Sequence, residues 1–179
     1  MRPVMDSVLY KVSPPRSDPM FHLSTFWHSP DWESSTTTFR AGYIEDTVLY
    51  AGDFDEVGIH LFPRVRSVRL RAQHADPSAL LACGIEVAQG ISSYIFIPEA
   101  RRAEVEAFHP TIFTFHADGF TRVRNGEYIS RLPRRAISSE TMPIQHAIRQ
   151  WRISVQYVSS LDRVLATLAG RGTCCEEQT

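Results

Sequence analysis

The residue best placed to do chemistry in this sequence is Glu127, which follows directly after the pair Asn125-Gly126. Asn-Gly is among the strongest signals for a two-residue hairpin turn, because such turns need positive φ angles. A strand that opens at Glu127 places Ile129 and Arg131 on the same face as the carboxylate. At the mouth of a sheet, this carboxylate could stabilise positive charge or move a proton. The structural alternative is an edge-strand charge that prevents aggregation.

Three other residues could assist such an acid. Lys11 is the only lysine among nineteen basic residues, so it is the only flexible ammonium in the chain. Tyr50 lies in the short apolar run TVLYAG, and Arg40 lies just before that run. An arginine presents a planar fork suited to phosphate, whereas a lysine acts as a point charge. Taken singly, Lys11 also fits a solvated strand position, and Tyr50 fits an ordinary core position.

The sequence contains no motif for metal binding, nucleophilic catalysis or a disulfide framework. The seven histidines include no pair at metal-ligand spacing on one helix, and neither a zinc motif nor a nucleophile elbow is present. We therefore expect no bound metal. Cys83, Cys174 and Cys175 give no disulfide framework, which points to a reducing compartment.

Composition indicates an ordinary globular protein. The 179 residues are 43% hydrophobic and 22% charged, with a net charge of -1, which argues against a purely electrostatic hold on nucleic acid. We expect one domain over residues 1–172 and a flexible tail over 173–179. No signal peptide or membrane-spanning stretch is evident, so a cytoplasmic protein without membrane partners is expected.

The elements that must position these residues read as an α+β fold of short, mainly antiparallel strands with inserted helices. Two turn pairs, Asp118-Gly119 and Asn125-Gly126, predict an antiparallel meander over Thr111–Arg131. The expected strands are 7–13, 47–52, 64–72, 92–98, 111–117, 120–124, 127–131 and 153–158. The expected helices are a weak one within 53–62, then 76–90, 98–108, 145–151 and 160–170. Residues 16–38, rich in Ser, Thr and Pro but also in large aromatics, read as a long packed loop that walls a site or covers a sheet edge.

Three segments in order resemble the motifs of the ADP-ribosyltransferase superfamily. Leu9-Tyr10-Lys11-Val12-Ser13 resembles the first motif strand, where the family usually has histidine or arginine at the position of Lys11. Val48-Leu49-Tyr50-Ala51-Gly52 resembles the second motif strand. Asn125-Gly126-Glu127-Tyr128-Ile129-Ser130 is similar to the glutamate motif of poly(ADP-ribose) polymerases, with one glycine inserted. Arg40 also looks like the arginine of the RES-type NAD-degrading toxins.

This resemblance implies an ADP-ribosyltransferase-like split mixed sheet and an enzyme that uses NAD as a substrate. Glu127 would be the catalytic acid, and Lys11, Arg40 and Tyr50 would bind NAD. Tyr50, or an aromatic residue of the 21–32 segment, would stack on nicotinamide. ADP-ribose would pass to a nucleic acid or a protein, and the arginine-rich 64–71 segment could contact a nucleic-acid acceptor.

Several alternatives remain open. An enzyme of the same fold could hydrolyse NAD instead of transferring ADP-ribose. A non-catalytic binding module could keep the fold without the activity. Toxins of this kind usually occur with a neutralising partner. If the protein is a toxin or a defence or counter-defence effector, we therefore expect an antitoxin or regulatory partner.

Overall fold

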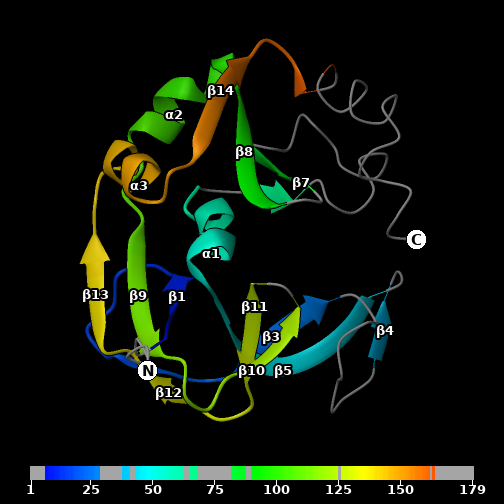
Figure 1. The fold of residues 1–179 in the computed structure, drawn as a ribbon, viewed down its shortest axis with the longest axis vertical. Coiled ribbons are helices and arrows are strands. Elements are labelled where there is room, and N and C mark those ends of the chain that lie inside the picture. Colours follow the sequence, from blue (N-terminus) through cyan, green and yellow to red (C-terminus); the bar gives the residue numbers. More distant parts are fainter. Residues whose placement is uncertain are drawn as a thin grey trace, which may run out of the picture. The chain divides into compact units, whose positions relative to one another are not determined.

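A computed structural model describes residues 7–28, 38–40, 43–62, 65–67, 82–87, 90–124, 126–161 and 163. These residues form an α+β arrangement in which most strand pairs are antiparallel (Figure 1). The chain divides into two compact units, Met1–Val57 with Thr111–Glu140, and Gly58–Pro110 with Thr141–Thr179. One domain over 1–172 stays a prediction, and the predicted tail 173–179 lies outside the described residues.

The first unit is built on a sheet with β5 near its centre. Among the described residues it has eight strands, in the order β10-β11-β5-β1-β9-β13, and both β3 and β4 also pair with β5. The strands are β1 (Val8–Val12), β3 (Ser24–His28), β4 (Thr38–Arg40), β5 (Tyr43–Gly52), β9 (Thr111–His116), β10 (Thr121–Arg124), β11 (Glu127–Ser130) and β13 (Ser138–Thr141). Two short strands, β2 (Met20–Phe21) and β12 (Arg134–Arg135), pair separately.

Alternation along β5 gives this sheet two different faces. Leu49 packs on one face with a cluster of aromatic and small residues, namely Phe21, Phe113, Phe115 and Ala136. Val48 and Tyr50 pack on the other face with Ile129, and Phe26 and Val123 lie at the margin of that cluster. Both faces of β5 are therefore buried over its second half.

The second unit contains a four-stranded mixed sheet in its described part, in the order β14-β8-β7-β6. The strands are β6 (Val65–Ser67), β7 (Ala82–Val87), β8 (Gly90–Pro98) and β14 (Ser154–Val158), and the β14–β8 and β6–β7 pairs are parallel. A 3-10 turn η3 (Glu99–Arg101) leads into helix α2 (Arg102–Glu106), which lies near α3 (Ile144–Gln150) in Figure 1. Helix α1 (Phe54–His60) follows β5 in the chain.

Many of the predicted elements are confirmed. Strands occur within 7–13, 47–52, 92–98 and 153–158, and helices occur within 53–62, 98–108 and 145–151. β5 begins earlier than predicted, at Tyr43. Of the predicted 64–72 strand, 65–67 are extended, and 68–72 lie outside the described residues. Within the predicted closing helix over 160–170, Leu161 and Arg163 are helical, Ser160 is not, and 162 and 164–170 lie outside the described residues.

The predicted meander is wrong in its first connection. All three strands form and β10 pairs with β11, but β9 is separated from them by β1 and β5. Gly119 has φ +83°, whereas Arg152 is the only described non-glycine residue with positive φ, so Asp118 is not positive. A primed hairpin turn needs positive φ at its first central residue, and the Ala117–Phe120 turn instead fits type II.

Two other predictions are corrected. Residues 82–87 form strand β7 instead of the second half of a helix, because Val, Ile and Cys pair there with β8; residues 76–81 lie outside the described part. The 16–38 segment is not all loop. β3 pairs with β5 along its whole length, as its Thr and aromatic content favours, and 29–37 are not described.

Candidate functional site

The candidate site lies where β5 ends and β11 begins, beside the start of α1. Glu127 pairs with Gly52, and Ile129 pairs with Tyr50. Since alternate residues of a strand share a face, Glu127 and Tyr50 project from the same side of the sheet. The hydroxyl oxygen of Tyr50 lies 3.4 Å from Glu127 Oε1. Two of the four predicted site residues are thus in direct contact.

A tight turn fixes the start of β11. Gly126 has φ +81°, a conformation that L side chains rarely adopt. A Cβ atom at this position would also lie 3.0 Å from Glu56 Cβ and 3.1 Å from Asp53 Oδ1. The Asp53 amide donates a hydrogen bond to the Gly126 carbonyl at 2.9 Å. The turn before Glu127 is therefore tied directly to the residue that precedes α1.

Asp53 also caps α1. Its Oδ1 accepts hydrogen bonds from the amides of Asp55 at 3.1 Å and Glu56 at 3.0 Å, as an N-cap carboxylate does. Partial burial, and then the charge of Asp53, raise the pKa of Asp55. The cap sets the direction of the first helical turn, and with it the position of Glu56.

Glu56 is the site residue that the sequence reasoning missed. Its side chain is only 5% exposed, and its Oε1 accepts a hydrogen bond from the Tyr50 hydroxyl at 3.2 Å. Gly52 gives it room, because a Cβ there would lie 3.2 Å from both Cβ and Cγ of Glu56. The available signal was an acid six residues after Tyr50, in the first turn of a short helix that directly follows the strand.

Two carboxyl groups therefore meet one phenol. A tyrosine hydroxyl carries a single proton, so it can donate to only one carboxylate at a time. The hydroxyl can also accept a hydrogen bond from a protonated carboxyl group. The three groups would then be linked by one continuous chain of hydrogen bonds. Such a chain can hold a proton and pass it between Glu127 and Glu56, which is the task of a general base and its relay.

Phe26 covers one side of the Tyr50 ring. The two rings stack with centroids 5.1 Å apart and planes inclined by 8°. Phe26 comes from the segment that was predicted to supply an aromatic residue, but here it packs on Tyr50 itself. Tyr50 is 9% exposed, so this contact and the sheet leave it little surface for a ligand ring.

Lys11 lies on the other face of the sheet. It pairs with Phe113, which clusters with Leu49, the neighbour of Tyr50 in β5. Its ammonium is 3.4 Å from the Tyr50 main-chain carbonyl, and burial lowers the pKa of Lys11 below its ordinary value of 10.5. The structure thus brings Lys11 to the backbone of Tyr50 but not to the carboxyl groups.

Arg40 is described only in its backbone, which pairs with Tyr43 at the end of β4. Its side chain lies outside the described part, so its role in binding NAD stays a prediction. Among the described residues, no group of three or more His, Cys, Asp or Glu side chains could hold a metal ion. In that same part, every helix is too short or too polar to cross a membrane.

Comparison with known proteins gives no match to any family model, curated protein or solved structure.

Proposed function

We propose that this protein is an NAD-dependent ADP-ribosyltransferase that modifies a macromolecule. The observation that carries the proposal is the contact of Tyr50 with Glu127 and Glu56. The order of strands adds support. The three segments that resemble the family's motifs are β1, β5 and β11, which are neighbours in one sheet. An ADP-ribosyltransferase-like fold is part of this proposal.

The proposed reaction breaks the bond between nicotinamide and the ribose C1′. The bonding electron pair leaves with nicotinamide, and the sugar gains oxocarbenium character. The carboxylate of Glu127 stabilises this positive charge. A nucleophile of the acceptor then bonds to C1′, and its proton passes to Glu127. Tyr50 holds the Glu127 carboxylate in position and links it to Glu56, which can take up the proton.

The burial of Glu56 supports this division of roles. A carboxyl group that is 5% exposed meets little water, so its hydrogen bond to Tyr50 stays directed. Glu127 as a whole residue is less buried than Glu56, and the proposal assigns it the contact with the substrate. Lys11 has no part in this mechanism because it lies on the other face. Arg40 keeps its proposed contact with the pyrophosphate.

The test uses NAD labelled in its adenylate part, incubated with the protein and a cell lysate. We expect label in a macromolecular fraction, and nuclease and protease treatment will identify the acceptor. Glu127→Gln should lower the rate about 100- to 1000-fold, because it removes the charge that stabilises the transition state. Tyr50→Phe should lower it about tenfold, because it removes one hydrogen bond to a charged group.

Glu140→Gln is the matched control. It removes an exposed carboxylate from β13 in the same unit and should leave the rate unchanged. Release of nicotinamide without labelling of a macromolecule would show that the enzyme hydrolyses NAD instead of transferring ADP-ribose. Full activity of Glu127→Gln would end the proposal for this site.

A further inference from the structure

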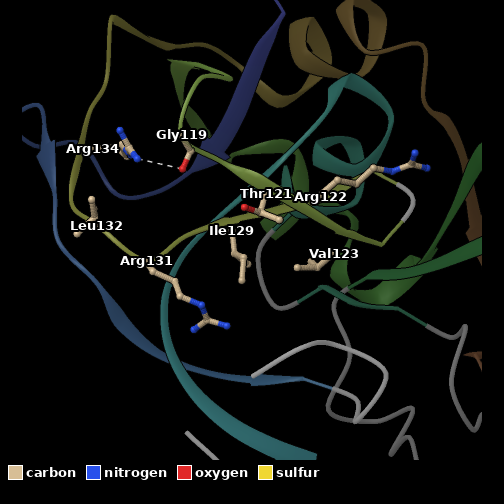
Figure 2. Close-up of a pocket in the computed structure, with 8 residues that line it drawn as sticks. All are labelled: Gly119, Thr121, Arg122, Val123, Ile129, Arg131, Leu132 and Arg134. Atoms are coloured by element: carbon tan, nitrogen blue, oxygen red, sulfur yellow. Dashed lines mark hydrogen bonds between the residues drawn. The ribbon is translucent and has the colours of Figure 1, made fainter. Parts of the chain in front are cut away.

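A second site candidate lies beside the β10–β11 hairpin, and its lining does not include Tyr50, Glu56 or Glu127. A cleft of about 680 Å³ opens there. Its lining contains three arginines and no acidic residue among the described residues: Gly119, Thr121, Arg122, Val123, Ile129, Arg131, Leu132 and Arg134 (Figure 2). The volume falls within the range of about 300–1,000 Å³ that is common for small-molecule sites.

Arg134 is held in this cleft by neutral groups. Its Nε donates to Ser130 Oγ at 2.9 Å, and its Nη2 donates to the Gly119 carbonyl at 3.0 Å (Figure 2). Ser130 is buried and also bonds the main chain of Leu132. Arg134 forms no ion pair with any described carboxylate. The guanidinium is therefore fixed in position while its charge is not neutralised.

Gly119 is needed for this arrangement. Its φ of +83° suits glycine, and a Cβ atom at this position would overlap the guanidinium group of Arg134. The backbone of Arg134 is also fixed, because it pairs with Phe21 between β12 and β2. An arginine that is ordered before a ligand arrives loses less entropy on binding.

The other two arginines differ from Arg134. Arg131 Nη1 lies 3.1 Å from Asp46 Oδ1 and 3.2 Å from Oδ2, and Asp46 is fully buried, so this pair is neutral overall. Arg122 extends its guanidinium away from Arg131 and Arg134 in Figure 2. Arg134 is therefore the lining arginine that neutral groups hold in position without an ion pair to a described carboxylate.

An apolar surface lies beside this charge. Leu132 is 63% exposed and Val123 is partly exposed, whereas Ile129 is only 4% exposed and packs with Val123 in the cluster around Tyr50. A ligand that suits the cleft combines an oxyanion with a flat, weakly polar group. A nucleotide has this combination, because a phosphate matches the arginine fork and a base has an apolar face.

We propose that this cleft binds the phosphate group of a nucleotide, either free or within a single strand, with Arg134 as the anchor. The base rests on the apolar surface next to it. The site is separate from the hydroxyl of Tyr50 and does not depend on the proposed reaction with NAD.

The experiment is titration calorimetry of the full chain at low salt with inorganic phosphate, AMP and a short single-stranded oligonucleotide. We expect AMP to bind more tightly than phosphate. Arg134→Gln should weaken AMP binding at least about tenfold, since a hydrogen-bonded charge pair is lost. The tighter of AMP and the oligonucleotide identifies the source of the phosphate.

Arg135→Gln is the matched control, because it removes the same charge from the next residue, which is exposed and does not line the cleft. The AMP affinity of this variant should stay within about twofold of that of the unchanged protein, as expected for an exposed charge that does not touch the ligand. A second variant, Leu132→Glu, puts a carboxylate on an exposed lining position and should also weaken AMP binding. Ile137→Glu changes an exposed residue outside the lining, so it should leave AMP binding unchanged.

Three results would overturn the proposal: no binding of any probe, equal binding of phosphate and AMP, or equal losses of AMP affinity in Arg134→Gln and Arg135→Gln. Thermal unfolding of each variant confirms that it is folded before its binding is compared.

Discussion

The two faces of the sheet in the first unit are built from the same strands but differ in chemistry. On the Leu49 face, Phe21 meets Phe113 and Phe115 edge to face, with ring centroids 4.8 and 5.3 Å apart. On the Tyr50 face, the carboxyl groups of Glu127 from the sheet and Glu56 from α1 contact the phenol, and the ion pair of buried Asp46 with Arg131 lies farther along. Among the described residues, the Leu49 face is mainly an apolar core that also holds the partly buried amine of Lys11 and the buried hydroxyl of Ser130, and the other face is a polar network beside a smaller cluster.

This difference separates the residues that mainly stabilise the fold from the residues that could do chemistry. Apolar packing contributes in proportion to the area buried, and it needs no particular partner. Buried polar groups need specific partners, and they are costly when a partner is lost. The Leu49 face should therefore respond to changes in volume, and the Tyr50 face should respond to changes in charge and hydrogen bonding.

The largest expected effect comes from matched truncations of one phenylalanine on each face. Phe113→Ala should reduce the free energy of unfolding by about 3–5 kcal/mol, because Phe113 is only 2% exposed and its loss leaves a cavity. Phe26→Ala on the Tyr50 face should cost about 1–2 kcal/mol, since its ring is half-buried and stacks on one partner. Urea unfolding measures both, and equal losses would refute the contrast.

The next effect concerns the ion pair on the Tyr50 face. Arg131→Met should destabilise the fold by about 2 kcal/mol, because it removes the ion pair between Arg131 and the buried Asp46 carboxylate. The double variant with Asp46→Asn should recover part of this loss, since the buried carboxylate charge is then removed. Arg135→Met is the exposed control and should change stability by less than about 0.5 kcal/mol. A double variant that loses more free energy of unfolding than the two single variants together would contradict the pairing.

The smallest effect has the opposite sign and lies on the Leu49 face. Burial lowers the pKa of Lys11, so the unfolded chain binds this proton more tightly than the folded chain does. Stability is therefore reduced below the lowered pKa, and it recovers as the pH rises from that value toward 10.5. Lys11→Met should be more stable than the unchanged protein at pH 7, and this advantage should shrink by pH 10. Unfolding midpoints at both values measure it, and a constant difference would show that the amine is not the cause.

The local elements were largely predictable, and their pairing was not. The Pro and Gly signals around 92–98 and 111–131 gave strands that form as expected, because turn chemistry and β-propensity act over a few residues. The same signals did not exclude a hairpin between β9 and β10. That pairing was decided by β1 and β5, which lie between the two strands although they are far away in the sequence.

For the candidate site, the sequence by itself determined that Glu127 opens a strand and shares a face with Ile129, since the residue period of a strand is two. It also drew attention to Tyr50. Only the tertiary structure decided that Glu56 joins them and that Lys11 lies on the other face. The reason is physical: the face on which a residue lies follows from its own strand, but the groups that share that face come from pairings and helix starts that no local pattern encodes.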